Sequence, residues 1–128
     1  MYKVLIIEDA PINMLLTSTV MTRYGHETMQ ATNAVDGVQR ARDFHPDVIL
    51  MDLSMPRMDG FAATRILKGD LATRDIPIIA VTASNQRTDK ERALNAGCDA
   101  YVTKPIVPRV LMSEIESVLR GHSNGSQA

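Results

Sequence analysis

The sequence predicts an α/β fold in which five strands of a parallel sheet alternate with five helices. The first observation is a set of apolar runs at residues 4–7, 48–51 and 76–81, which are typical of strands buried on both faces of a sheet. The second is that stretches with helical spacing of apolar residues separate the strand-like runs. Such alternation implies right-handed crossovers and helices on both faces of the sheet.

The order of the elements follows from these runs and from local start and stop signals. The expected strands are residues 4–7, 26–32, 48–52, 76–82 and 101–103. The expected helices are residues 11–24, 34–44, 60–68, 89–96 and 107–120. Pro11 suits the first turn of a helix, and Asp59 can cap the third helix. Gly25, Gly97 and Gly121 can each close a helix in the left-handed conformation.

Apolar residues at intervals of three and four support the helices. In the first helix these residues are Ile12, Leu15, Leu16 and Val20. In the last helix they are Val107, Val110, Leu111, Ile115, Val118 and Leu119, an amphipathic pattern. Gly37 weakens the second helix by roughly 1 kcal/mol relative to alanine.

Length and composition exclude several classes of protein. A chain of 128 residues forms one domain, for which we expect residues 1–121, followed by a polar, disordered tail at 122–128. Fourteen basic and fifteen acidic residues give a net charge of -1, which argues against direct nucleic-acid binding. The single Cys98 excludes an internal disulfide and fits a reducing cytosol. The run 4–7 is too short for a signal sequence or membrane span, so we expect a cytoplasmic protein without membrane association.

Polar side chains stand at the ends of four of the predicted strands. They are Glu8 and Asp9 after the first strand, Asp52 at the end of the third, Thr82 at the end of the fourth and Lys104 after the fifth. Each of them alone has an ordinary explanation as a strand exit, a helix cap or a surface charge. The carboxyl ends of parallel strands meet at one edge of a sheet, however, so we expect these side chains to converge.

The chemistry of this group points to a cation and to phosphoryl transfer. Two like charges 4 Å apart repel by about 4 kcal/mol at an effective dielectric of 20, so three carboxylates need a cation or a raised pKa. We expect one acid to titrate above its ordinary range without metal, because of this repulsion. Mg²⁺ prefers oxygen ligands, and a carboxylate can form an aspartyl phosphate. Lys104 and Thr82 could then contact the transferred group.

Six short motifs occur in a specific order and spacing. They are residues 6–9, 46–52, 55–60, 77–83, 96–97 and 104–105. From Lys3 to about Arg120, the chain resembles the response-regulator receiver domains of two-component signalling. The resemblance implies a flavodoxin-like, doubly wound (βα)5 fold whose five-stranded parallel sheet has the order 2-1-3-4-5. The chain departs from the family pattern at Ala34, where glycine is frequent, and at Gly37, where alanine is frequent; both positions lie in the second helix.

The resemblance also implies roles for individual residues. Asp52 would be the phosphoacceptor, and Thr82 and Lys104 would contact the phosphoryl group. The implied Mg²⁺ ligands are Glu8, Asp9, Asp52 and the backbone carbonyl of Ser54. Tyr101 would be a switch residue that turns inward as Thr82 moves, although a half-buried strand tyrosine is an equally ordinary interpretation. Lys104 and Pro105 would be joined by a cis peptide bond.

The implied function is a phosphorylation-dependent switch of a two-component system or phosphorelay, and not an enzyme beyond its own phosphorylation and dephosphorylation. A histidine kinase or histidine phosphotransfer protein would donate the phosphoryl group to Asp52. The surface around the fourth helix, fifth strand and fifth helix would then change for a downstream protein target. We expect a monomer or a weak phosphorylation-dependent dimer. We expect no output domain in this chain, which is either a stand-alone receiver, as Met1 favours, or a piece of a longer protein.

Three alternatives compete with this interpretation. A haloacid-dehalogenase-type phosphatase also uses a strand-end aspartate, but it needs an acid two residues later, where this chain has Ser54. A flavodoxin needs a hydroxyl- and glycine-rich loop after the first strand, where Asp9 would repel the flavin phosphate. An interaction module that is never phosphorylated would not need the complete set of acids, threonine and lysine. The three histidines share no metal-binding spacing, and Cys98 is expected to be a small buried residue.

Overall fold

The computed structural model describes residues 1–53, 55 and 59–123, with only the backbone at 122 and 123. The strands in this part of the chain are β1 (Lys3–Ile7), β2 (Glu27–Ala31), β3 (Val48–Asp52), β4 (Ile78–Thr82) and β5 (Ala100–Thr103). The helices are α1 (Pro11–Arg23), α2 (Ala34–Phe44), α3 (Gly60–Gly69), α4 (Arg87–Ala96) and α5 (Pro108–Ser123). Strands and helices alternate along the chain as the sequence predicts.

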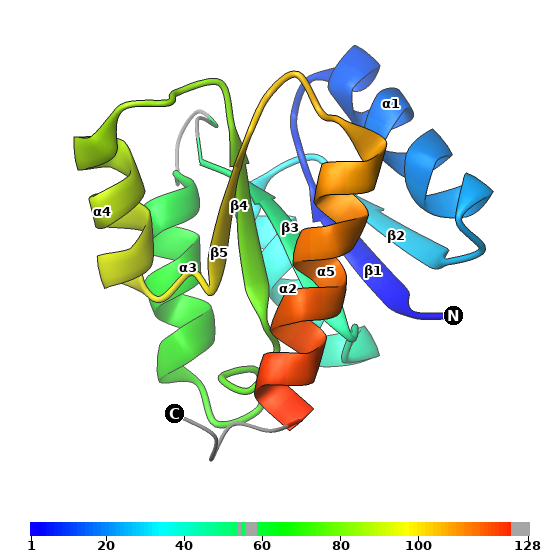
Figure 1. The fold of residues 1–128 in the computed structure, drawn as a ribbon. Coiled ribbons are helices and arrows are strands. Elements are labelled where there is room, and N and C mark those ends of the chain that lie inside the picture. Colours follow the sequence, from blue (N-terminus) through cyan, green and yellow to red (C-terminus); the bar gives the residue numbers. More distant parts are fainter. Residues whose placement is uncertain (54, 56–58, 124–128) are drawn as a thin grey trace.

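The five strands form one parallel sheet in the order β2-β1-β3-β4-β5. Figure 1 shows α1 and α5 on one face of this sheet and α2, α3 and α4 on the other. The predicted flavodoxin-like topology is therefore confirmed. Because all strands are parallel, the segments that follow β1, β3, β4 and β5 lie at the same edge of the sheet, the upper edge in Figure 1.

Alternate side chains of each central strand enter two separate cores. Leu5 and Ile7 of β1 pack among the apolar residues of α2, α3 and α4, whereas Val4 and Ile6 pack with those of α1 and α5. Every residue of β3 is buried, including the terminal Asp52. The apolar run that predicted a strand covered on both faces thus places one carboxylate at the end of a fully buried strand.

Helix α1 begins at Pro11 as predicted and ends at Arg23, one residue earlier than expected, but most of the apolar residues that predicted it face solvent. The exposed fractions of Ile12, Leu15 and Leu16 are 75%, 67% and 56%. The side chains that α1 buries are Met14, Thr17, Ser18 and Met21. Apolar residues lie on both sides of this helix, so their spacing identifies the helix but not the face that packs on the sheet.

The other differences from prediction concern the ends of elements. Helix α4 begins at Arg87, two residues earlier than expected, and β4 begins at Ile78, after Pro77, which has no backbone N–H to donate. Helix α5 does not stop at Gly121 but continues to Ser123, so the predicted tail begins in a helical turn. Residues 124–128 lie outside the described part. No helix in the described part combines the length and hydrophobicity that a membrane span requires.

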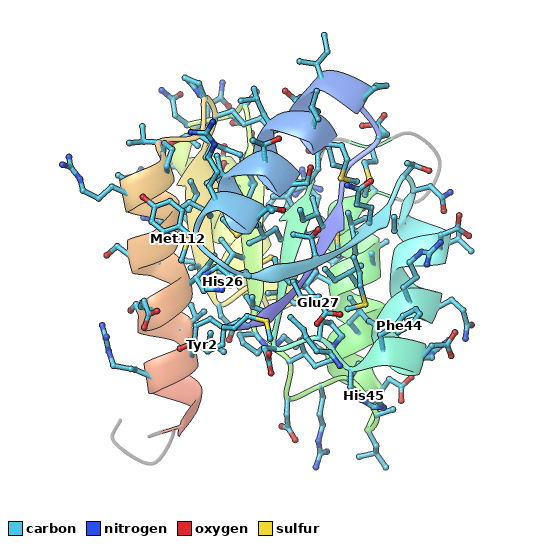
Figure 2. All side chains as sticks on the ribbon, turned by 90° about the vertical axis from the view of Figure 1, so that its right-hand side faces the viewer. Tyr2, His26, Glu27, Phe44, His45 and Met112 are labelled. Atoms are coloured by element: carbon cyan, nitrogen blue, oxygen red, sulfur yellow. The ribbon has the colours of Figure 1, made fainter. Side chains whose placement is uncertain are left out.

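Two of the three histidines serve packing and chain reversal. The rings of Tyr2 and His26 stack with their centroids 5.4 Å apart, and the Tyr2 amide donates to Nδ1 of His26 over 3.1 Å (Figure 2). His45 ends α2 in the left-handed conformation, with φ of 48°. Both residues have structural roles, as expected. Cys98 is buried beside the hydroxyl of Thr64, which is also expected.

Gly60, the first residue of α3, lies directly against the end of β3. A β-carbon at this position would approach the carbonyl oxygen of Asp52 to 2.5 Å and the α-carbon of Leu53 to 2.6 Å. Both neighbours are backbone atoms, so a side chain could fit only if the strand end that carries Asp52 moved. By contrast, Gly69 at the end of the same helix has open space around its α-carbon.

Gly60→Ala should lower the free energy of unfolding by about 1–3 kcal/mol, the usual effect of overpacking. Gly69→Ala is the matched control and should leave stability unchanged or raise it by up to about 1 kcal/mol through helix propensity. Urea denaturation of both variants measures the difference. A Gly60→Ala protein as stable as the wild type would contradict the close approach of α3 to β3.

Candidate phosphoryl and metal site

Hydrogen bonds of the sheet fix the backbone that carries the acidic residues. Glu8 follows β1, and its amide donates to the carbonyl of Ala31 over 3.0 Å, which extends the pairing of β1 with β2. Asp52 is the last residue of β3 and lies opposite Val81 of β4. The sheet therefore holds these two carboxylates side by side on adjacent strands, β1 and β3, without help from a flexible loop.

The three predicted acids form one cluster at the carboxyl edge of the sheet. Glu8, Asp9 and Asp52 each place one oxygen within 4.8 Å of the others. Glu8 and Asp52 are 4% and 5% exposed, whereas Asp9 is exposed at the rim. An all-oxygen donor set of this size, with two buried ligands and one accessible ligand, fits Mg²⁺, which keeps several of its waters.

Lys104 supplies the positive charge of the cluster. Its Nζ lies 2.8 Å from Oε1 of Glu8 and 3.8 Å from Oδ2 of Asp52. The Lys104 amide donates to the carbonyl of Thr82 over 2.7 Å, and the peptide bond between Lys104 and Pro105 is cis, as the resemblance implied. One ammonium group is thus shared between two buried carboxylates, and it contacts Glu8 more closely than the predicted phosphoacceptor.

Burial raises the pKa of the Glu8 carboxyl above its ordinary value, and the nearby carboxylate of Asp52 raises it further. Hydrogen bonds from Lys104 and from the amide of Ala10, 3.1 Å from Oε2 of Glu8, act in the opposite direction. The expectation that one acid of the cluster titrates above its usual range is confirmed in direction. The main cause of the raised pKa is burial and not like-charge repulsion. The Glu8 side chain is almost fully buried, and its charged form therefore loses most of its contact with water.

Thr82 and Tyr101 both contact Ser84, in the loop that follows β4. Thr82 is 2% exposed, and its hydroxyl accepts a hydrogen bond of 3.3 Å from the amide of Ser84. The Tyr101 hydroxyl donates to the carbonyl of Ser84 over 2.6 Å, and its ring packs partly buried against the core beneath α3 and α4. Both residues implied as switches are therefore coupled to the loop between β4 and α4.

Two residues near this site differ from the others in how they compare with prediction: one cannot be checked, and one was not predicted to take part. Ser54, whose backbone carbonyl was the fourth implied Mg²⁺ ligand, lies outside the described residues. Asp89 was interpreted only as the start of the fourth helix, but its Oδ2 accepts a hydrogen bond of 2.6 Å from the hydroxyl of Ser84. A serine–aspartate pair five residues apart across a loop and a helix start has no strong sequence signal.

Comparisons with known proteins agree on one family. The model of the response regulator receiver domain matches residues 4–116. The protein PilH of Pseudomonas aeruginosa is 41% identical over 121 residues, which cover 94% of this chain and all of PilH. The polar-differentiation response regulator DivK of Brucella ovis is 42% identical over 109 residues, which cover 84% of this chain and 89% of DivK.

Solved structures give the same result. The receiver domain of a sensor histidine kinase from P. aeruginosa PAO1, solved with a magnesium ion coordinated in its active site cleft, matches with a TM-score of 0.86 and 30% identity. The match covers 92% of this chain and 97% of that one. The receiver domain of a histidine kinase from Syntrophus aciditrophicus matches with a TM-score of 0.85 and 34% identity, over 94% and 92% of the two chains.

Carboxyl NMR titration of the metal-free protein should place the pKa of Glu8 above that of an ordinary glutamate, because burial disfavours its charged form. Where folding raises the pKa of an acid, the native state keeps a proton that the unfolded chain has already lost. The proton retained on Glu8 therefore stabilises the native state at low pH. This stabilisation should be lost as pH rises from the ordinary glutamate pKa through the pKa of Glu8 in the folded protein.

Saturating Mg²⁺ should move the titration of Glu8 to lower pH, because a metal ligand must be deprotonated. The signal of Asp43, an exposed carboxylate on α2, should not respond to Mg²⁺ and serves as the control. If Mg²⁺ left the Glu8 titration where it was, Glu8 would not belong to the metal site.

Proposed function

Because the chain belongs to the response regulator receiver family, we propose that Asp52 accepts a phosphoryl group from a phosphohistidine on a partner protein. The observation that carries this proposal is the position of Asp52. Its carboxylate ends a fully buried strand, shares a cluster with two other acids and lies 3.8 Å from the ammonium group of Lys104. A nucleophile, a charge to meet the transferred group and the ligands of a cation are thus present together.

In the proposed reaction, an oxygen of Asp52 attacks the phosphorus of the phosphohistidine. An O–P bond forms, the P–N bond breaks, and its electron pair stays on the imidazole, which leaves as a neutral ring because its other nitrogen carries a proton. Glu8, Asp9 and Asp52 would hold Mg²⁺, with the Ser54 carbonyl as the further ligand that the family implies. When bound, Mg²⁺ neutralises the oxygens of the phosphoryl group. Lys104 can turn from Glu8 toward the same oxygens, since its Nζ already lies between Glu8 and Asp52.

The phosphoryl group would act as a switch through Thr82 and Tyr101. It adds negative charge and acceptor oxygens, so the Thr82 hydroxyl, which accepts from the Ser84 amide at 3.3 Å, gains an acceptor to which it can donate. Movement of Thr82 would release the loop that Tyr101 also contacts, and so change the surface of α4, β5 and α5. This surface exposes Leu94, Val107 and Val110 by 43%, 48% and 45%, which suits a downstream protein partner.

The chain would catalyse only its own phosphorylation and, through attack of water on the aspartyl phosphate, its own dephosphorylation. The family match supports this over a phosphatase that turns over free substrates, and Ser54 leaves that alternative without its second acid. The single cysteine supports a place of action in the cytoplasm, where histidine kinases present their phosphohistidine.

Incubation with acetyl phosphate and Mg²⁺ should give the wild type one acid-stable, base-labile phosphate, and Asp52→Asn should take up none. Asp43→Asn removes an exposed carboxylate of α2 and should be labelled like the wild type. Intact-protein mass spectrometry measures the added mass. Labelling that persists in Asp52→Asn, or a wild type that takes up no phosphate, would refute the proposed acceptor.

The outer face of α1 supports docking of the phosphohistidine protein next to the site. Helix α1 begins two residues after Asp9, and its sequence from Pro11 to Thr22 contains no charged residue. Its exposed stripe of Ile12, Leu15 and Leu16 therefore adjoins the rim of the acidic cluster. An amphipathic helix of the donor could cover this stripe while its phosphohistidine reaches Asp52.

Leu15→Glu should slow phosphotransfer from a phosphorylated histidine phosphotransfer protein at least about tenfold, because it places a charge in the apolar contact. Its labelling by acetyl phosphate should stay at the wild-type rate, since Leu15 is not part of the site. Leu71→Glu, at a site 77% exposed beyond the end of α3, is the matched control and should affect neither reaction. Equal slowing of both reactions in Leu15→Glu would argue for damage to the fold and against docking.

A further inference from the structure

His26 carries the only buried side-chain nitrogen or oxygen that lacks a hydrogen-bond partner in the described part of the chain. This atom is Nε2 of its ring. The other ring nitrogen, Nδ1, accepts a hydrogen bond of 3.1 Å from the amide of Tyr2. Because a neutral imidazole has one donor and one acceptor nitrogen, the proton of His26 is on Nε2. The ring is thus held by a hydrogen bond in which it is the acceptor, while its own donor has no partner.

His26 lies where three elements meet at the amino edge of the sheet. Its amide donates to the carbonyl of Met21, near the end of α1, over 3.0 Å. The next residue, Glu27, begins β2 and donates its amide to the carbonyl of Tyr2 over 2.9 Å, at the start of the pairing between β1 and β2. The ring of His26 stacks on that of Tyr2, which packs, like Met112 of α5, against the core on the α1 and α5 side of the sheet (Figure 2). One residue therefore connects the start of β1 with the end of α1 and the start of β2.

A positive charge on His26 is incompatible with this arrangement. Protonation would place a second N–H on Nδ1, which faces the N–H of Tyr2, so that two donors would face one another. Nε2 would remain a buried donor without a partner, now on a charged ring. The ring could therefore become charged only by moving away from Tyr2, whose amide would then lose its acceptor.

The charges around His26 act on its ring in opposite directions. The charged groups closest along the surrounding segments are the amino terminus and Lys3 of β1, Arg23 of α1, Glu27 of β2, and Glu116 and Arg120 of α5. Burial is the main cause that lowers the pKa of His26 below its ordinary value, and the positive amino terminus lowers this pKa further. The carboxylate of Glu116 acts the other way. A protonated ring would therefore be repelled by the start of the chain and attracted by α5.

We propose that His26 is an acid-sensitive joint, which keeps the start of β1 attached to α1 and β2 only while its ring is neutral. Acidification removes the acceptor of the Tyr2 amide, weakens the adjoining hydrogen bond from Glu27 to Tyr2, and so loosens the amino end of this pair of strands. The joint lies at the edge of the sheet opposite the acidic cluster, the lower edge in Figure 1. It is independent of the function proposed for Asp52.

The direction of the pH effect follows from the pKa of His26. Because folding lowers this pKa, the unfolded chain binds a proton that the native protein does not bind, in the range between the two pKa values. The stabilisation by neutral His26 is therefore complete above the ordinary histidine pKa of about 6.5 and is lost as pH falls toward the pKa of the folded protein.

Urea denaturation of three proteins tests the joint: the wild type, His26→Asn and the control His45→Asn. The Oδ1 atom of asparagine can accept from the Tyr2 amide as Nδ1 of histidine does, but asparagine takes up no proton between about pH 8 and about pH 5. His45 is exposed and ends α2 with φ of 48°, a conformation that asparagine tolerates.

Between about pH 8 and about pH 5, the unfolding equilibrium constant of the wild type should rise about five- to tenfold more than that of His26→Asn, the effect of losing one hydrogen bond. His45→Asn should follow the wild type. Glu8 titrates with the opposite sign, but it is present in all three proteins and cancels in the comparison.

NMR of the wild type shows whether the change is local. The amide proton signals of Tyr2 and Glu27 should shift as pH falls, with the same apparent pKa as the ring signals of His26. The amide of Gly97, which donates to the carbonyl of Leu94 at the end of α4, should not follow this titration and serves as the control. This measurement needs no variant, so it decides the question if His26→Asn does not fold.

Three results would overturn the joint. The first is an equal dependence of stability on pH in the wild type and His26→Asn. The second is a Tyr2 amide signal that stays in place while the ring of His26 takes up its proton. The third is a ring of His26 that titrates at or above the ordinary histidine pKa, because neutral His26 would then give the folded protein no stability that acid removes.

Discussion

The shared ammonium group of Lys104 is the interaction on which the acidic site depends. Glu8 and Asp52 are almost fully buried on adjacent strands, and two such charges repel by several kcal/mol at this range. Although β3 and β4 separate β1 from β5 in the sheet, the turn after β5 brings the lysine Nζ to 2.8 Å from Glu8. This ammonium group stabilises two carboxylates that are almost fully out of water, one of them the proposed phosphoacceptor Asp52.

At this edge of the sheet, the acidic cluster and the residues of the proposed switch are held by different segments. The carboxylates and Lys104 are held by β1, β3 and the turn after β5, whereas Thr82 and Tyr101 both contact the loop before α4. In the proposed switch, a phosphoryl group on Asp52 would therefore change the loop without moving the sheet that carries Asp52. Gly60 contributes to this rigidity, since α3 begins in contact with the backbone of the strand end. The proposed acceptor thus lies on a rigid sheet, next to a loop that contacts Thr82 and Tyr101.

Much of this arrangement could be predicted from sequence because its signals are local and periodic. The apolar run before Asp52 identified a strand buried on both faces, and the parallel order of strands placed Glu8, Asp9 and Lys104 beside it. Prediction was less accurate where a helix has apolar residues on two faces, because only packing decides which face is buried. The spacing of Leu15 and Leu16 marked a helix but not its exposed face, since α1 carries apolar residues on both sides. Two further features could not be predicted from the spacing of residues, because they depend on neighbours in three dimensions. They are the hydrogen bond between Ser84 and Asp89 and the large effect of burial on the pKa of Glu8.

The most direct test of the account compares Mg²⁺ with Lys104 as alternative cations for one set of carboxylates. Urea denaturation of the wild type and of Lys104→Met, each with and without the same concentration of Mg²⁺, measures how much the metal raises the free energy of unfolding. If both cations serve Glu8 and Asp52, Lys104→Met should be less stable without metal and should gain more stability from Mg²⁺ than the wild type does. An equal or smaller gain in Lys104→Met would contradict a single shared site.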